Sequence, residues 1–254
     1  MIFDSHSHTA FSGDSEMKAE EALAAADVAG IGLVFTEHLD LDYPGDIDFT
    51  FDPATYWQQY EPLRGDRLML GIEVGMQSAT AERSRAFVDT VPFDLVIDSV
   101  HMVDGKDIYY KEAYGNLSKA EFFHKYYQQM ADNIRQHGFI DVLGHIDYIA
   151  RYAPYEDPEI SYGSFQADID AVLKAAIETD TVLELNTRRL GSRLAVKELL
   201  PVYSRYRGLG GRFVTLGSDA HTADAIGGNF RIARELVEAV GLKTVTFRER
   251  KIVL

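Results

Sequence analysis

The chain has 254 residues, of which 46% are hydrophobic and 26% charged, and it contains no cysteine. These values are typical of a domain with one sizeable core, and the lack of cysteine excludes disulfides, thiolate nucleophiles and Cys-based zinc or iron–sulfur sites. The formal net charge of −15, from 40 acidic and 25 basic residues, opposes binding to nucleic acid and favours a small-molecule substrate.

The sequence shows no targeting or membrane-spanning segment. The amino terminus lacks a basic region followed by an apolar one, and no apolar run approaches the roughly 20 residues that cross a bilayer. We therefore expect a cytoplasmic protein without a membrane partner, folded as a single domain over residues 1–254. Nothing in the sequence indicates an oligomeric state.

Short apolar runs alternate with helical patterns along the chain. Strands are predicted at residues 2–3, 33–35, 68–74, 95–100, 141–143, 182–185 and 213–216. Helices are predicted at residues 20–28, 80–87, 118–134, 165–177, 195–206 and 223–240. Ser118 and Glu121 have the spacing of a capping box at the start of one of these helices.

This alternation predicts an α/β fold with a parallel sheet. Seven strand–helix repeats in a chain of this length favour a closed or nearly closed barrel, and a doubly wound open sheet is the alternative. The final segment, residues 244–254, is interpreted either as an extra strand or as an edge closure.

Six of the eight histidines lie at or just beyond the end of a predicted strand. They are His6, His8, His38, His101, His145 and His221. Glu73 and Asp219 occupy similar positions, and the carboxyl ends of barrel strands share one mouth, so all these side chains should converge on one cavity. A single strand-end histidine is usually only a satisfied polar residue, but imidazoles and bridging carboxylates together favour a multinuclear metal site.

Two features of the histidine pattern refine this interpretation. His6 and His8 are one residue apart in a strand, so both side chains point to the same face. We exclude His124, which we expect to pack among helical aromatic residues, and His137, whose place before Gly138 suits a helix carboxyl terminus.

The motifs resemble those of the polymerase and histidinol phosphatase (PHP) superfamily over nearly the whole chain. The residues that carry the resemblance are His6-Ser7-His8-Thr9, Thr36-Glu37-His38, Glu73, Ser99-Val100-His101, Gly144-His145 and Ser218-Asp219-Ala220-His221. The chain length, Phe11 to Ser15 and Gly144 to Tyr152 resemble the stand-alone histidinol-phosphatase branch. The resemblance implies a distorted, TIM-like (β/α)7 barrel and a phosphoric monoester hydrolase of histidine biosynthesis.

The resemblance also implies two to three divalent transition-metal ions at the barrel mouth. Their identity, whether Zn, Mn, Fe or Co, is not indicated by the ligand types. The implied first site consists of His6, His8, Glu73 and Asp219; the second consists of Glu73, His101 and His145; the third consists of Asp14, His38 and His221. Asp14 replaces a histidine found in some family members, and it could instead be a turn former in its Ser-Gly-Asp-Ser context.

These residues predict direct hydrolysis of a phosphate monoester by a water that the metals activate. Glu73, Asp219 and His221 are the expected catalytic residues. Arg151 and Arg188 are expected to bind the phosphate, although either could be a surface arginine paired with a neighbour. Arg189 is an alternative to Arg188 for this role. An acidic segment at residues 38–48 either receives a cationic substrate end or is simply solvated.

Three other functions share parts of this pattern. A related PHP phosphoesterase would act on another small-molecule, nucleotide or protein phosphate. A nuclease would need a basic track, which the net charge opposes. A metal-binding module would keep the ligands without turnover, yet no candidate ligand is missing from the motifs.

Overall fold

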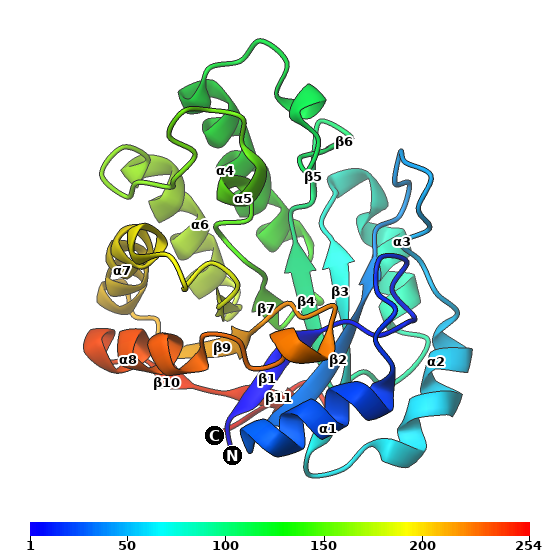
Figure 1. The fold of residues 1–254 in the computed structure, drawn as a ribbon. Coiled ribbons are helices and arrows are strands. Elements are labelled where there is room, and N and C mark those ends of the chain that lie inside the picture. The colour runs from blue at the N-terminus through cyan, green and yellow to red at the C-terminus, as the bar shows by residue number, and fades with distance from the viewer.

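The computed structural model describes residues 1–254, and its parallel strands form a curled sheet with helices on the outside (Figure 1). The strand order in the sheet is β1-β2-β3-β4-β7-β8-β9-β10. The strands are β1 (Phe3–Ser7), β2 (Gly32–Leu39), β3 (Leu68–Gly75), β4 (Leu95–Ser99), β7 (Val142–Leu143), β8 (Val182–Asn186), β9 (Phe213–Gly217) and β10 (Lys243–Thr244). The first seven are the predicted strands. Because they follow chain order without reversal, the TIM-like barrel is confirmed and the doubly wound alternative is wrong.

The barrel closes only at its carboxyl-terminal end. There, the edge strand β1 meets the chain that follows β9 through hydrogen bonds from His8 N to Ala220 O (2.9 Å) and from Asp219 N to His6 O (2.8 Å). The register of β1 against β2 shifts between Asp4 and Ser7, which distorts this edge. The closure brings the first and last predicted motifs together.

Apart from the single turn α5, which lies beyond the carboxyl ends of the strands, the helices lie outside the sheet on its convex side (Figure 1). They are α1 (Ala19–Ala29), α2 (Pro53–Tyr60), α3 (Ala81–Val88), α4 (Lys119–Gln136), α5 (Ile149–Tyr152), α6 (Gln166–Glu178), α7 (Arg193–Gly208) and α8 (Phe230–Val240). The capping box of α4 is confirmed, since Ser118 and Glu121 each accept from the other's backbone N–H. The helix predicted at 223–240 is divided because Gly227 and Asn229 adopt positive φ angles of 67° and 59°. The sequence patterns did not predict α2 or the single turn α5.

Side-chain alternation divides the inner face of the barrel into two layers. On β2, Val34 packs in the lower apolar cluster and His38, on the same face, reaches the mouth; Met69 and Glu73 do the same on β3. The lower cluster contains Phe3, Val34, Met69, Leu95, Ile97, Val142, Val182, Val245 and Phe247. A dry layer thus supports the polar layer that forms the mouth, while the main core lies between sheet and helices.

The carboxyl-terminal segment covers the bottom of the barrel. After β10 pairs with β9, the hairpin of β11 (Thr246–Arg248) and β12 (Lys251–Val253) places Val245 and Phe247 in the lower apolar cluster. Its turn is fixed by Asp94, which accepts from the backbone N–H of Glu249 at 2.9 Å. Segment 244–254 therefore supplies both an extra strand and a closure.

At the opposite end, a short hairpin of β5 (Met102–Val103) and β6 (Lys106–Asp107) rises beside the mouth (Figure 1). The segment from His38 to Asp48 approaches it, because Tyr43 donates a hydrogen bond to Asp107 (2.7 Å). No helix of the structure is both long and apolar enough to cross a membrane.

Candidate metal and phosphate site

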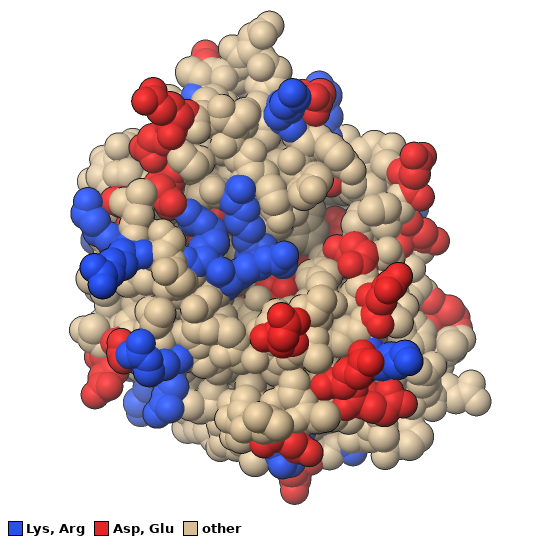
Figure 2. All heavy atoms as spheres, viewed as in Figure 1, with Lys and Arg blue, Asp and Glu red and all other residues tan.

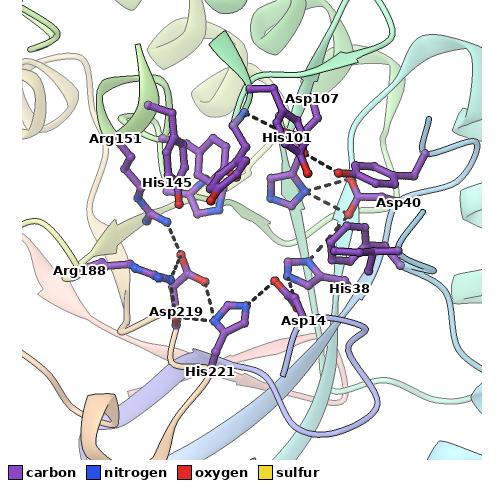
Figure 3. Close-up of a pocket in the computed structure, with 17 residues that line it drawn as sticks. Asp14, His38, Asp40, His101, Asp107, His145, Arg151, Arg188, Asp219 and His221 are labelled. Carbon is purple, nitrogen blue, oxygen red and sulfur yellow. Dashed lines mark hydrogen bonds and ion pairs between the residues drawn. The ribbon is translucent and has the colours of Figure 1, made fainter. Parts of the chain in front are cut away.

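A cavity of about 400 Å³ opens at the carboxyl ends of the strands (Figure 3). The structure brings all nine predicted metal ligands together at this mouth. Their mutual contacts involve His6, His8, Asp14, His38, Glu73, His101, His145, Asp219 and His221. Arg151 and Arg188 also line the cavity.

Glu73 lies at the centre of the histidine cluster and is fully buried. One oxygen, Oε2, is 2.9 Å from His38 Nδ1 and 3.2 Å from His6 Nε2. The other, Oε1, is 3.0 Å from His145 Nε2 and 3.3 Å from His101 Nε2. A single carboxylate thus faces imidazoles on both sides, as a bridging ligand between two cations would.

Further carboxylates fix the tautomers of the surrounding imidazoles. His6 Nδ1 lies 2.6 Å from Glu184 Oε1, and His101 Nδ1 lies 3.0 Å from Asp40 Oδ1. Since an ionised carboxylate only accepts, each Nδ1 carries the proton and each Nε2 presents its lone pair to the cluster. Unpaired imidazole nitrogens of this kind are ready to bind a cation.

His8 is oriented in the same way through a hydroxyl. Ser12 Oγ donates to Glu37 Oε2 (2.7 Å), so it accepts from His8 Nδ1 at 3.1 Å and leaves Nε2 free. Glu37 is buried and also accepts from the Thr9 backbone and hydroxyl. On β2, alternation sends Glu37 to the face opposite His38, where it acts on the cluster indirectly.

Unsatisfied polar atoms test whether these residues fit a metal. Five buried atoms of the clustered residues have no hydrogen-bond partner: His6 Nε2, His8 Nε2, His38 Nδ1, His145 Nδ1 and Glu73 Oε2. Leaving such atoms unpaired in a protein interior is costly, whereas nitrogen and oxygen donors of this kind suit a divalent transition metal. The donor set therefore fits metal ions.

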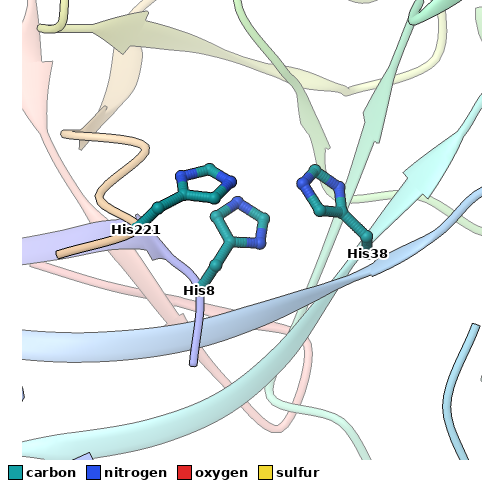
Figure 4. A group of neighbouring side chains, drawn as sticks. All are labelled: His8, His38 and His221. Carbon is teal, nitrogen blue, oxygen red and sulfur yellow. The ribbon is translucent and has the colours of Figure 1, made fainter. Parts of the chain in front are cut away.

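Three overlapping groups of residues each have donor atoms that all lie within 4.8 Å of one another. They are His8, His38 and His221 (Figure 4); His6, His8 and Glu73; and His38, Glu73 and His101. Glu73 is shared between two groups, as in the ligand sets that the resemblance implied, whereas the sharing of His8 and His38 differs from those sets. The assignment of each residue to a particular ion stays a prediction.

The charges in the cluster strongly perturb one another. Although burial opposes it, the nearby carboxylates Glu73 and Glu184 raise the pKa of His6 well above its ordinary value. Burial acts in the opposite direction on Glu73, but neighbouring imidazoles lower the pKa of this carboxyl well below its usual range. His6 and Glu73 therefore stabilise charge in each other, and a bound cation would replace the second proton on His6.

Asp219 links the cluster to the arginines. Its Oδ1 lies 3.5 Å from His8 Nε2, and its Oδ2 accepts from Arg151 Nη1 at 2.5 Å. The side chain of Arg151 is only 6% exposed and also donates to Asn186 (2.9 Å), so both arms of its guanidinium are engaged. The side chain of Arg188 is 46% exposed and lies 3.7 Å from Asp219 Oδ2, which leaves it freer to meet a ligand.

Asp14 approaches the cluster from the loop that follows β1. Its Oδ2 lies 3.1 Å from His221 Nε2, and its Oδ1 lies 3.6 Å from His38 Nε2. Asp14 is 34% exposed, more than the other carboxylates of the cluster. It is placed to act as a ligand, although this role stays a prediction.

Other sequence expectations have mixed outcomes. Arg189 pairs with Asp147 (2.9 Å) and does not line the cavity, so it is no competitor of Arg188. The packing role expected for His124 is wrong, because its side chain is 60% exposed and faces Asp168 on the neighbouring helix. His137 is buried against Asp98 (2.8 Å), away from the site, as its exclusion required.

The acidic segment at residues 38–48 contributes less to the cavity than its composition indicated. Of its four aspartates, only Asp40 lines the cavity, and it holds His101. Asp42 pairs with Arg83 outside the mouth, and Asp48 accepts from Thr50. The segment's cavity-lining residues also include Tyr43 and Ile47, so most of its negative charge is solvated.

Glu184 and Glu37 were not predicted from the sequence as partners of the candidate ligands. Glu184 lies two residues after Val182 on β8, so both side chains are on the inner face of the barrel. A charged residue on the inner face of an otherwise apolar strand is a signal that the sequence contains. Gly217 makes room for it, since a Cβ there would lie 2.1 Å from Glu184 Oε1 and 2.5 Å from His6 Cβ.

Comparison with known proteins places these features in context. Residues 4–188 match the family model of the PHP domain. A probable histidinol-phosphatase of Clostridium acetobutylicum is 44% identical over 250 residues, which cover 98% of both chains. The histidinol-phosphatase of Lactococcus lactis subsp. lactis is 30% identical over 257 residues, covering 98% of this chain and 95% of the relative.

A solved structure resembles the whole chain. It is the crystal structure of histidinol phosphate phosphatase from Lactococcus lactis subsp. lactis, complexed with zinc, L-histidinol and phosphate. Its TM-score is 0.94 at 30% identity, and the match covers 100% of this chain and 99% of that one.

Proposed function

This chain belongs to the PHP domain family, and from that premise we propose that it is a histidinol-phosphatase, a phosphoric monoester hydrolase that converts L-histidinol phosphate and water to L-histidinol and phosphate. The observation that carries the proposal is the full-length match, at a TM-score of 0.94, to a phosphatase complexed with zinc, L-histidinol and phosphate. The convergence of His, Glu and Asp side chains on one cavity supports it independently.

Two to three divalent ions would be held by the nine clustered residues, with Glu73 shared between sites. When bound, such ions supply a Lewis acid for the phosphoryl oxygens and lower the pKa of a water molecule. Zinc is the first metal to test because the solved relative contains it.

The chain's own residues orient the reacting groups. Glu184, Asp40 and the Ser12–Glu37 pair hold the imidazoles in fixed tautomers, so the donor atoms need no rearrangement on binding. Arg188, the more exposed of the two cavity arginines, is positioned to take phosphate oxygens. Arg151 fixes Asp219 and extends the cationic side of the cavity.

We retain one second candidate, a phosphoesterase of the same family with another small phosphate ester, because the ligand cluster does not itself select the alcohol. Phosphate release from L-histidinol phosphate, p-nitrophenyl phosphate and a nucleoside monophosphate separates the two. The proposal predicts the highest kcat/KM for L-histidinol phosphate. Equal turnover of all three esters, or preference for another ester, would contradict it.

A further inference from the structure

The proposed function leaves the alcohol end of the substrate without an assigned receptor, and the present inference rests on that function. Besides its phosphate, L-histidinol phosphate carries a primary amine, which is protonated near neutral pH, and an imidazole ring. A selective enzyme needs a group that recognises this cation.

Only one of the aspartates that line the cavity has no histidine or arginine partner. Four aspartates line the cavity, namely Asp14, Asp40, Asp107 and Asp219. Asp14 and Asp40 face histidines of the cluster, and Asp219 faces Arg151. Asp107, at the end of β6, forms no ion pair. Its negative charge is therefore available to a ligand.

Asp107 is nevertheless held firmly. Its Oδ2 accepts from the Tyr43 hydroxyl at 2.7 Å, and its Oδ1 accepts from the Tyr109 backbone N–H at 2.8 Å. These donors come from different loops of the mouth, so the carboxylate has a fixed position before a ligand arrives. A preorganised charge of this kind costs little reorganisation on binding.

Aromatic rings line the same cavity as this carboxylate. Tyr109, Tyr110 and Tyr152 all line the cavity, and the ring of Tyr109 lies 5.0 Å from that of Tyr110 and 4.8 Å from that of Tyr152. Tyr109 and Tyr110 remain 53% and 49% exposed. Tyrosine faces attract a cation and pack well against an aromatic ring, which matches both groups at this end of the substrate.

The charges of the mouth are arranged to orient such a molecule. Arg151 and Arg188 lie on one side of the cavity, while Asp107 lies on the other (Figure 3). On the surface of this face, basic side chains gather on the left of the hollow and acidic ones on its right (Figure 2). A substrate with a phosphate at one end and a cation at the other fits this polarity.

We propose that Asp107, positioned by Tyr43 in a cavity that Tyr109, Tyr110 and Tyr152 also line, binds the ammonium group of the substrate and makes the enzyme selective for an amino-alcohol phosphate. Asp107 is thus a specificity residue that lies outside the metal cluster. It replaces the acidic segment at residues 38–48 as the expected receptor of the cationic end.

The test compares two substrates, L-histidinol phosphate and its N-acetyl derivative, which has lost the positive charge. The measured quantity is the kcat/KM for L-histidinol phosphate divided by the kcat/KM for the N-acetyl derivative. Asp107→Asn keeps an oxygen that can accept from the Tyr109 N–H, yet it removes the charge, so the ratio should fall about 10-fold or more. Tyr43→Phe leaves the charge and removes only its positioning hydroxyl, so the ratio should fall by a smaller factor.

Asp104→Asn is the matched control, because it removes the same charge from the same hairpin at a residue that pairs with Lys125 outside the cavity. Its ratio should stay within about twofold of the unmodified protein. A ratio in Asp107→Asn equally close to that of the unmodified protein would overturn the inference. If Asp107→Asn fails to fold, an unchanged ratio in Tyr43→Phe does the same.

The unmodified protein distinguishes this failure from failure of the proposed function. If it hydrolyses L-histidinol phosphate efficiently while Asp107→Asn keeps the same ratio, only the role of Asp107 is wrong. If it hydrolyses p-nitrophenyl phosphate with added zinc but not L-histidinol phosphate, both the proposed function and the inference are overturned. Calorimetric binding of L-histidinol gives a second readout, which Asp107→Asn should weaken by a similar factor.

Discussion

Replacement of Glu184 by glutamine tests whether fixed imidazole tautomers prepare the metal cluster. Glu184 Oε1 lies 2.6 Å from His6 Nδ1, and Oε2 accepts from the His145 backbone N–H at 2.7 Å. Glutamine can keep only one of these contacts. With its oxygen toward His6, its NH₂ group opposes the His145 N–H; turned around, it donates to His6 Nδ1 and moves the imidazole proton to Nε2, where a metal would bind.

Both orientations carry a cost that can be measured. A buried donor facing another donor destabilises the fold by about 1–3 kcal/mol, and loss of an outer-shell partner typically lowers metal affinity by about 10- to 100-fold. We therefore expect Glu184→Gln to bind zinc at least about 10-fold more weakly in a competition assay with a chromogenic chelator. Activity should be partly restored at high zinc concentration.

Glu178→Gln is the control for this experiment, since Glu178 is 58% exposed and pairs with Arg135 on the outer surface. It should bind zinc as the unmodified protein does. Zinc affinity within about twofold of the unmodified protein in Glu184→Gln, with the fold intact by circular dichroism, would refute the role of Glu184 in setting the His6 tautomer.

Three further predictions concern other parts of the molecule. Glu73→Gln removes the carboxylate shared by the cluster, so bound zinc, measured by elemental analysis, and phosphate release should fall together; full zinc content would contradict the bridging role. In Arg151→Lys the lysine cannot contact both Asp219 and Asn186, so kcat/KM for L-histidinol phosphate should fall about 10-fold or more. Unchanged kinetics would show that Arg151 has no role in turnover. Burial raises the pKa of Asp94, but hydrogen bonds from Arg64 and backbone N–H groups outweigh it and lower that pKa, so its stabilisation is present above the unfolded pKa of about 3.9 and is lost as pH falls below it. Asp94→Asn should therefore lower the free energy of unfolding, measured in urea, by about 2 kcal/mol at pH 7 and by progressively less at lower pH. Asp66→Asn, at a side chain that is 96% exposed, should change this free energy little at pH 7 or pH 3. A loss of free energy in Asp94→Asn that is as large at pH 3 as at pH 7 would contradict the lowered pKa of Asp94.

The parts of the fold that depend on local pattern were predictable from the sequence. Strand and helix alternation indicated the barrel, and the candidate ligands could be identified because catalytic side chains follow barrel strands at their carboxyl ends. The two-residue β7 was identified by its apolar run despite its length. Its neighbours along the chain, such as His145, then fell at the mouth.

The features that escaped depend on contacts between distant segments. The hairpin that covers the bottom of the barrel is held there by contacts such as that of Glu249 with Asp94, more than 150 positions earlier in the chain. The role of Glu184 was not predicted because it depends on the facing His6, which the strand pattern alone does not identify as its partner. Asp107 lies in a two-residue strand of a hairpin that resembles a loop in sequence. Composition likewise indicated residues 38–48 as a receptor for a cationic substrate end, although most of the charges of this segment are solvated.

The proposed metal-dependent phosphatase activity is tested most directly by phosphate release from L-histidinol phosphate by the same protein sample before chelation, after removal of metal, and after zinc is added back. We expect efficient turnover, its loss with the chelator, and its recovery with zinc, because the donors around Glu73 are arranged for cations. Turnover that persists in protein shown by elemental analysis to contain no metal would show that the activity does not depend on this cluster of donors.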